Sequence, residues 1–266
     1  AAMLTGPIAQ SLMANVGVVN TFYILGGFYF VVMLVAAQFI KKPRSHELPP
    51  AIAKNAERIS LTGRELTANQ ALRTRTFAFL WFMFFINITT GIGLVSAASP
   101  MAQDMTTMTA SAAAVMVGII GLFNGFGRLA WATLSDFIGR PLTYSLIFVL
   151  DIVMLFVLLL FKAPFIFALA LCLLMSCYGA GFSVIPAYLG DVFGTKELGA
   201  IHGYILTAWA IAGMVGPLLL SYTHQVLHNY YVTLIVFIII DALAMIVSLL
   251  IQRDFITNRQ TKLVIK

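Results

Sequence analysis

The chain has 266 residues, of which 61% belong to the hydrophobic types and only 10% are charged. An ordinary soluble domain carries about 25% charged residues, and it needs them to cover its surface in water. The composition therefore argues against soluble enzymes, nucleic-acid-binding domains and disordered tails, although the formal net charge is +6. It predicts an all-α, polytopic helical membrane protein, because helices satisfy their own backbone hydrogen bonds in lipid.

Windows of about 20 apolar residues mark the candidate membrane spans. They cover residues 18–40, 77–99, 110–134, 142–161, 165–189, 199–222 and 231–251. The first 40 residues contain no charged side chain, and one helix of that length would measure about 60 Å, twice the bilayer core of about 30 Å. We therefore expect a break near residues 15–17. The piece before it looks like the end of a truncated helix, so we expect further chain upstream.

A polar loop follows the first span and carries eight basic and three acidic residues. Its Thr62-Gly63-Arg64-Glu65 pattern resembles a capping box, so we expect a short surface helix to begin there. The predicted organisation is a remnant with a turn, a single helix, a central loop, a six-helix domain and a tail, over residues 1–17, 18–40, 41–76, 77–252 and 253–266.

The basic residues are distributed unevenly between the two sides of the predicted bundle. If the spans alternate in direction, fourteen of the sixteen fall on one side: eight in the loop, one at Arg140, one at Lys196 and four in the tail. The other side holds only Lys162, and Arg128 lies within a span. The positive-inside rule then places the central loop and the C-terminus in the cytoplasm, with the protein in the cell membrane.

Arg128 is the first candidate functional residue. A charge inside a span is costly and is tolerated where it faces a cavity or a partner. Its guanidinium stays protonated and matches a carboxylate in a two-point contact. Asn124 precedes it by one turn, and glycines at 118, 121, 125 and 127 permit close helix approach. We interpret Arg128 as an anion-binding residue; the alternatives are an internal salt bridge or snorkelling toward the cytoplasmic end.

Asp151 and Asp241 are the other charges inside predicted spans. A desolvated carboxylate can titrate near neutral pH, so either residue could carry protons. Either could instead satisfy a neighbouring helix. The pattern of residues leaves both interpretations open.

The stretch GRLAWATLSDFIGRP, residues 127–141, resembles the loop signature of the major facilitator superfamily. That signature has the form Gly-x-x-x-Asp-[basic]-x-Gly-Arg-[basic], and Asp136, Gly139 and Arg140 match it. The sequence departs from the signature at three positions, Ala132, Phe137 and Pro141. The aspartate of such a turn can accept from a helix N-terminus and its arginine can pair with an acid. We expect a cytoplasmic conformational latch here.

A second stretch, residues 185–217, looks like the turn between helices ten and eleven of the oxalate/formate antiporter family, with Phe-Gly-Thr-Lys at 193–196 and Gly-Ala-Ile-His-Gly at 199–203. The segment GLFNGFGRLAW, residues 121–131, resembles helix eight of that family, whose arginine contacts the carboxylate substrate. The resemblance covers nearly the whole chain from about residue 6. It implies a twelve-helix protein of two six-helix halves, of which this chain holds the end of helix five, helix six, the central loop and the second half.

One position departs from that family. Oxalate-transporting members are expected to carry a lysine in helix eleven within Thr-Ala-Lys, whereas this sequence reads Thr207-Ala208-Trp209. No lysine lies between Lys196 and Lys262, so a dicarboxylate would leave one charge unpaired. A monocarboxylate such as formate, lactate or pyruvate fits a single arginine better. Trp209 either forms an aromatic wall of the pocket or packs.

The resemblance also bears on other polar residues in the spans. It places Asp151 in helix nine and Asp241 in helix twelve, which are peripheral supports in this fold and not cavity walls. Asn87 in helix seven and Tyr204 in helix eleven are better candidates to line a cavity, together with Thr89. Hydrogen bonding between helices is the alternative role for all three.

Other classes of membrane protein fit the sequence less well. A retinal protein is disfavoured because the last span has no lysine, and an intramembrane aspartyl protease because Tyr188-Leu189-Gly190-Asp191 lacks the first glycine of Gly-x-Gly-Asp. A receptor or a membrane subunit without transport activity stays open. The favoured hypothesis is a secondary transporter, not an enzyme, that moves a small organic anion by alternating access as an antiporter or proton symporter. Its expected partners are the anion, the bilayer and the missing N-terminal half, with no cofactor, metal or nucleic acid.

Overall fold

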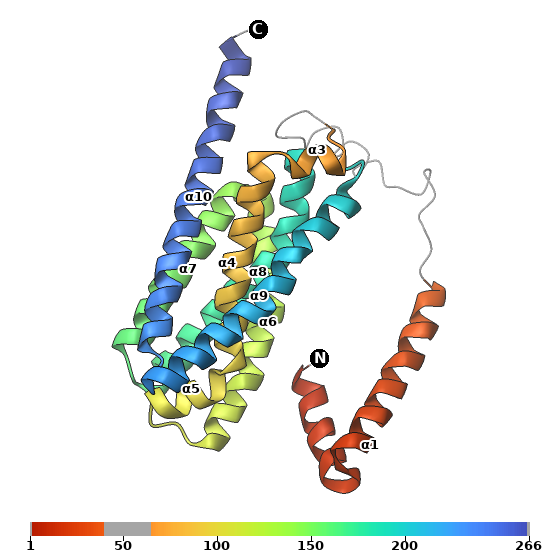
Figure 1. The fold of residues 1–266 in the computed structure, drawn as a ribbon, viewed down its shortest axis with the longest axis vertical. Helices are drawn as coiled ribbons and strands as arrows, with labels where there is room; N and C mark the ends of the chain where they lie inside the picture. The colour runs from red at the N-terminus through yellow and green to blue at the C-terminus, as the bar shows by residue number, and fades with distance from the viewer. Residues whose placement is uncertain (1, 40–64, 265–266) are drawn as a thin grey trace. The chain divides into compact units, whose positions relative to one another are not determined.

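The computed structural model describes residues 2–39 and 65–264, and these fall into two units that are each described by themselves, one within residues 1–58 and one within 59–266. The first unit is helix α1, Ala2–Phe39, whose backbone leaves helical geometry at Gly17 with φ 78° and ψ 166°. Such a positive φ is accessible to glycine without a Cβ clash. Figure 1 shows two helical arms meeting at this break, which confirms the break expected near residues 15–17.

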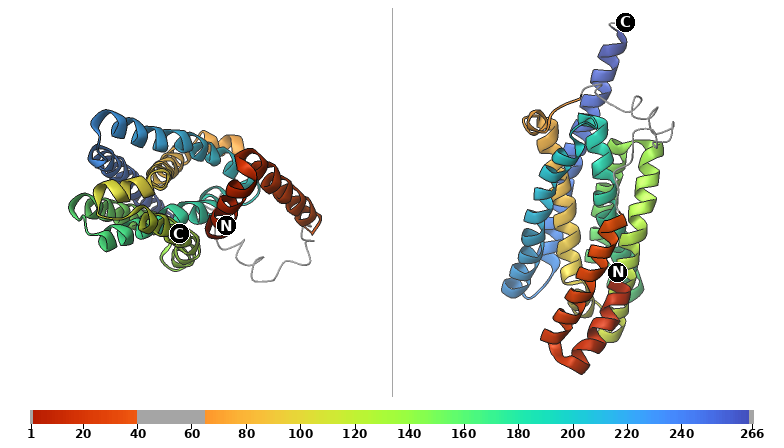
Figure 2. Two further views of the ribbon diagram at one scale, coloured as in Figure 1. Left: turned by 90° about the horizontal axis from the view of Figure 1, so that it is seen from below. Right: turned by 90° about the vertical axis from the view of Figure 1, so that its right-hand side faces the viewer.

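The second unit is a bundle whose long helices run along one general direction, as Figures 1 and 2 show. Its helices are α3 (Ala68–Leu72), α4 (Arg75–Ser96), α5 (Ala98–Met105), α6 (Ala110–Ile138), α7 (Arg140–Leu160), α8 (Pro164–Phe193), α9 (Leu198–Leu227) and α10 (Tyr231–Val264). We call the two ends of this bundle the α3 end and the α5 end, after the short helices that mark them in Figure 1. Among the described residues, seven helices are long and apolar enough to cross a membrane, which confirms the seven predicted spans.

The starts of the helices follow from local chemistry. The side chains of Thr74 and Thr109 accept from the backbone N–H groups of Phe77 and Ala112, at 3.1 and 3.3 Å, and so cap α4 and α6. Helix α8 begins at Pro164, where a missing N–H has no consequence because the first turn has no acceptor for it. A side-chain cap or a proline therefore favours the starts of α4, α6 and α8.

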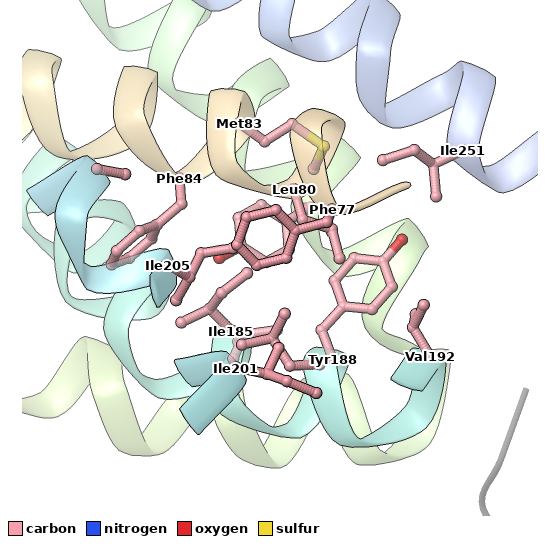
Figure 3. Packing of buried hydrophobic residues seen from close by; sticks show 14 of the residues in the cluster. Phe77, Leu80, Met83, Phe84, Ile185, Tyr188, Val192, Ile201, Ile205 and Ile251 are labelled. Carbon is pink, nitrogen blue, oxygen red and sulfur yellow. The ribbon is translucent and has the colours of Figure 1, made fainter. Parts of the chain in front are cut away.

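The core of the bundle lies where α6 packs on α8, α4 on α9 and α7 on α10. Toward the α3 end, aromatic and branched side chains from five helices interlock, among them Phe77, Phe84, Tyr188 and Ile201 (Figure 3). A second cluster toward the α5 end includes Phe167 of α8 and joins it to side chains of α5, α7 and α10. The two clusters hold the long helices together toward both ends of the bundle, and Tyr178 of α8 packs against both of them.

The structure differs from the sequence-based expectation in three places. Helix α5 was not predicted and extends α4 beyond Ser96 at the α5 end. The expected capping box at Thr62-Gly63-Arg64-Glu65 falls largely outside the described residues; the capping box that the structure shows uses Thr67 and Gln70 at the start of α3. Helix α10 continues to Val264, so described residues expected to form a tail extend the last helix.

Candidate functional site

Arg128 lies on α6 where this helix approaches α8 most closely. A Cβ on Gly127 would come within 2.5 Å of the backbone carbonyl oxygen of Ser176, and one on Gly179 would overlap the carbonyl oxygen of Asn124. Only residues without a side chain allow two backbones to come this near. Of the four α6 glycines noted in the sequence, Gly127 makes this close contact beside Arg128, whereas a Cβ at position 118, 121 or 125 would meet nothing within 4 Å.

The guanidinium of Arg128 is held by an amide and an aromatic ring. Its Nε donates to Oδ1 of Asn124 at 3.4 Å, and its Cζ lies 5.1 Å from the centroid of the Phe182 ring. The side chain is exposed, and the ion pairs found among residues 65–264 do not include it. The internal salt bridge that was the alternative interpretation is therefore absent from the described part of the chain.

Three aromatic rings form a continuous group beside Arg128. Tyr178 and Trp209 each meet the Phe182 ring edge-on, with ring centroids 5.5 Å apart in both pairs. Such edge-to-face arrangements are the favoured geometry of aromatic pairs. The structure thus brings together Arg128, Asn124 and Trp209. It adds Tyr178 and Phe182 of α8, which the sequence analysis did not propose, although their spacing of four residues places them on one helix face.

The other predicted cavity residues lie elsewhere. Tyr204 is 42% exposed on α9, and the contacts described for it do not reach Arg128. Asn87 is 1% exposed, and its Nδ2 donates to the backbone carbonyl of Cys177 at 3.3 Å. Thr89 is also buried and donates to the carbonyl of Phe85 at 2.7 Å. Asn87 and Thr89 thus bond within the bundle.

The turn between α6 and α7 holds the residues that matched the loop signature. Gly139 adopts φ 89°, which lets one residue end α6 and begin α7. Arg140 donates to Ser135 and to the Asp136 carboxylate. Its Nε also lies 3.6 Å from Oδ2 of Asp191, at the end of α8. Asp191 was not predicted, and the signal available was an acidic residue at the end of a span.

At the α3 end, two glutamate side chains connect the segment before α4 to the turn between α8 and α9. Glu65 accepts from the backbone N–H groups of Thr195 and Lys196, at 3.4 and 3.0 Å. In return Glu197 accepts from the N–H of Ala68 at 2.8 Å. Each carboxylate thus satisfies N–H groups where the other segment starts a helix. The segment before α4 is thereby fastened to the turn between α8 and α9.

A buried polar group lies behind α8, on helices α4, α7 and α10. The Asp151 carboxyl group is hydrogen-bonded by the side chains of Cys177 and Asn87. Oδ1 of Asp241 accepts from the Thr90 hydroxyl at 3.1 Å. Asp151 and Asp241 are 2% and 0% exposed, and they interact electrostatically with each other. Both predicted intramembrane aspartates therefore point into the bundle.

At the α5 end a histidine, an acid and a tyrosine meet. Nε2 of His224 lies 3.4 Å from Oδ2 of Asp104, and its ring stacks on Tyr230 with centroids 4.3 Å apart. Burial and the nearby Asp104 charge raise the pKa of the Tyr230 phenol above its usual value of 10. The phenol is therefore neutral at physiological pH, and the group ties α5 to the end of α9.

The chain is similar in sequence to known proteins that transport small molecules. The chain is 27% identical over 212 residues to the oxalate:formate antiporter of Oxalobacter formigenes, which covers 79% of this chain and 49% of that protein. It is 32% identical over 176 residues to apicoplast pyruvate carrier 1 of Toxoplasma gondii, covering 58% of this chain and 31% of that protein. The chain thus spans about half or less of the length of these relatives.

A solved structure and a family model agree with these relatives. The fold matches the Escherichia coli fucose:proton symporter with a TM-score of 0.66 over 90% of this chain and 57% of that one, at 13% identity, a likeness of fold alone. The family model of the Major Facilitator Superfamily matches residues 1–217 and residues 80–263. The resemblance to the major facilitator superfamily and to its oxalate/formate antiporter family is confirmed, and the chain belongs to the major facilitator superfamily.

Proposed function

We propose that the protein is a secondary transporter of a small organic anion, a monocarboxylate, with Arg128 as the residue that binds the carboxylate. The observation that carries this proposal is the state of Arg128: an exposed guanidinium beside three aromatic rings, with an amide and no carboxylate as its described partner. An unpaired arginine within a span is costly unless it serves a ligand. A carboxylate would supply the missing negative charge.

The geometry suits an anion with one charge. Asn124 accepts from Nε, which leaves the terminal nitrogens of the guanidinium for a two-point contact with a carboxylate. The Phe182 ring, 5.1 Å from Cζ, is close enough for a cation–π contact that holds the guanidinium beside α8. Trp209, 46% exposed, stands where the related family is expected to carry lysine. An apolar or hydroxylated tail of a monocarboxylate fits against it better than a second carboxylate.

We further infer that a second six-helix half of the same protein completes the site, and that the two halves rock about it in alternating access. The exposed side chains of Arg128, Trp209 and Tyr204 support this inference, because they need a polar or protein neighbour within a membrane. The basic residues near the α3 end support a cytoplasmic position for that end in the cell membrane.

The contact of Arg140 with Asp136 and Asp191 is proposed as the cytoplasmic latch of this cycle. It joins the turn between α6 and α7 to the end of α8 through a single guanidinium. Because the same side chain serves two helices, a relative shift of α6 and α8 would break one contact while the other persists. The latch then sets how readily the α3 end opens, and it leaves the anion site unchanged.

Uptake measurements on the full-length protein in proteoliposomes test the proposal. Labelled formate, lactate and pyruvate should each be offered, with unlabelled oxalate as a competitor, since one relative is an oxalate:formate antiporter. We expect uptake of at least one monocarboxylate, weak competition by oxalate, and strong loss in Arg128→Lys but not in Arg73→Lys, an exposed arginine at the α3 end. No uptake of any small anion would overturn the proposal in favour of a non-transporting subunit or receptor, and strong oxalate inhibition would favour oxalate/formate exchange.

A further inference from the structure

The carboxyl groups of Asp151 and Asp241 lie inside the bundle, remote from water. Asp151 on α7 faces Cys177 of α8 and Asn87 of α4, and Asp241 on α10 faces Thr90 of α4. All of these contacts come from neutral side chains, and within residues 65–264 neither carboxyl group takes part in an ion pair. Two carboxyl groups thus share the buried interior of the bundle without a described cation.

Elementary electrostatics decides the charge state of such a pair. An unpaired charge in a medium of low dielectric constant is far more costly than a neutral group, and two like charges side by side add to that cost. The neutral hydrogen-bond donors Thr90, Cys177 and Asn87 reduce the cost of one ionised carboxylate and cannot neutralise two. The doubly ionised state is therefore the costly one, and the pair favours binding a proton.

Two oxygen atoms of this buried polar group lack a hydrogen-bond donor. Oδ2 of Asp241 and Oδ1 of Asn87 are buried and have no hydrogen-bond partner in the structure. Buried oxygens in native proteins are rarely left without a donor. Oδ2 of Asp241 is therefore a position at which a proton can bind without displacing a hydrogen-bond donor.

We propose that Asp151 and Asp241 form a proton-binding site whose occupancy is coupled to the anion site on the other face of α8. This rests on the proposed function of Arg128 and specifies the coupling as proton symport. One proton binds to one carboxylate oxygen as one anion binds to Arg128, and both are released on the other side, so the translocated pair is neutral and no covalent bond other than O–H forms or breaks.

The coupling runs through one turn of α8. Cys177, which contacts Asp151, is followed directly by Tyr178, which interacts electrostatically with Arg128 and packs on Phe182. This turn is confined on both sides: Gly127 lies against the backbone of Ser176, and a Cβ at Gly91 would overlap the Tyr178 ring. A close-packed segment cannot shift one side chain alone. Movement of Tyr178 toward a bound anion would therefore displace Cys177 and change the surroundings of Asp151.

The first test compares net uptake with exchange in proteoliposomes that contain the full-length protein and a trapped pH-sensitive dye. For the wild type we expect uptake of a monocarboxylate to be accelerated by an inward proton gradient and accompanied by acidification of the lumen. Asp241→Asn and Asp151→Asn should lose this acceleration by at least tenfold while exchange of internal for external anion persists. The matched control, Asp254→Asn, changes an exposed acid on the same helix and should behave as wild type.

A second test uses Thr90→Val, a variant that leaves both carboxyl groups in place. Thr90→Val removes the hydroxyl that donates to Asp241, so the ionised form loses a hydrogen bond and the pH of half-maximal uptake should rise. A residue that only held the helices together would lower the amount of folded protein without moving this midpoint. Uptake by the wild type that is insensitive to pH and moves no protons, or that requires sodium instead, would overturn the proposal.

A third measurement does not depend on transport. Infrared spectra of the reconstituted protein should show the carbonyl stretch of a protonated carboxylic acid, and the double variant Asp151→Asn/Asp241→Asn should lack it. Absence of that band in the wild type, or its persistence in the double variant, would overturn the proton site. If the band behaves as expected and no anion is transported, the proposed function fails while the proton site stands.

Discussion

Arg128 lies over the ring of Phe182, with its Cζ 5.1 Å from the ring centroid, and this pair joins α6 to α8 at the level of the candidate anion site. Nε of the guanidinium donates to Asn124, and neither described contact uses the two terminal nitrogens. A carboxylate approaches an arginine in the plane of the guanidinium, so the two contacts are compatible. The contact therefore orients Arg128 without occupying the atoms that a ligand would use.

Replacing Arg128 by lysine tests the two-point contact. Lysine keeps the positive charge and loses the planar fork, so one charged hydrogen bond of about 1.5–3 kcal/mol should be lost. We expect the apparent KM for the transported monocarboxylate to rise by about 10- to 100-fold. Uptake kinetics in proteoliposomes measure this change, and near-normal kinetics would refute the proposed role.

Replacing Phe182 by leucine tests the cation–π contact. Such contacts contribute about 0.5–1 kcal/mol at exposed sites, so the apparent KM should rise by about 2- to 5-fold with little change in the maximal rate. The control is Phe126→Leu, because Phe126 is 68% exposed on α6, two residues before Arg128. Equal effects of the two variants would show that the ring at 182 has no specific contact with the ligand-binding arginine.

The proposed latch predicts a change of rate and not of affinity. Asp136→Asn weakens an exposed pair, worth about 0.2–1 kcal/mol, and should change the maximal rate by less than about 5-fold. Asp191→Asn removes the partner whose side chain is only 16% exposed and should have the larger effect. The measurements are initial rates across anion concentrations. A rise in KM at constant maximal rate would contradict the latch and would place these residues in binding.

The close approach of α6 and α8 predicts a stability difference between two glycines of one helix. A Cβ on Gly127 would meet the backbone of Ser176, whereas Gly125 has no atom within 4 Å of its Cβ position. Both alanine variants gain about 1 kcal/mol of helix propensity, so the difference isolates overpacking, about 1–3 kcal/mol. In detergent, we expect Gly127→Ala to have a lower apparent Tm than the wild type. The apparent Tm of Gly125→Ala should not fall below that of the wild type. Equal apparent Tm values for the two variants would show that α6 and α8 can move apart at position 127 without loss of stability.

The two carboxylate contacts at the α3 end predict a reciprocal pattern of hydrogen exchange. Glu65→Gln should speed exchange at the amides of Thr195 and Lys196, and Glu197→Gln should speed exchange at Ala68, since each loses a charge-assisted acceptor worth about 1 kcal/mol. Each variant is the control for the other. Unchanged exchange at these amides in both variants would show that the two segments are held by packing alone.

Much of the fold follows from the sequence because lipid imposes simple rules. Apolar windows of about 20 residues locate the seven spans, and an over-long charge-free stretch implies the break that the structure places at Gly17. Helix α5 escaped prediction because it is short, contains Pro100 and Asp104, and depends on packing against α6 and α8. Local pattern gives little information where a segment owes its shape to its neighbours.

The candidate site was predictable only along single helices. Asn124 and Arg128 lie one turn apart, so their contact could be expected from spacing alone. Phe182 and Asp191 come from α8, more than fifty positions away, and their approach to α6 depends on how the helices cross. Glycine spacing indicated that α6 packs closely, yet it could not name the helix against which it packs.

The glycine-lined approach of α6 and α8 also constrains how relatives of this chain can diverge. A side chain at position 127 or 179 would push the two backbones apart, so adaptation to a different anion is expected to occur at 178, 182 and 209. Position 178 is not independent, because its ring fills the space above Gly91. Among relatives, a small residue at 178 should accompany a larger one at 91, as a paired substitution that leaves the arginine in place while the pocket changes size.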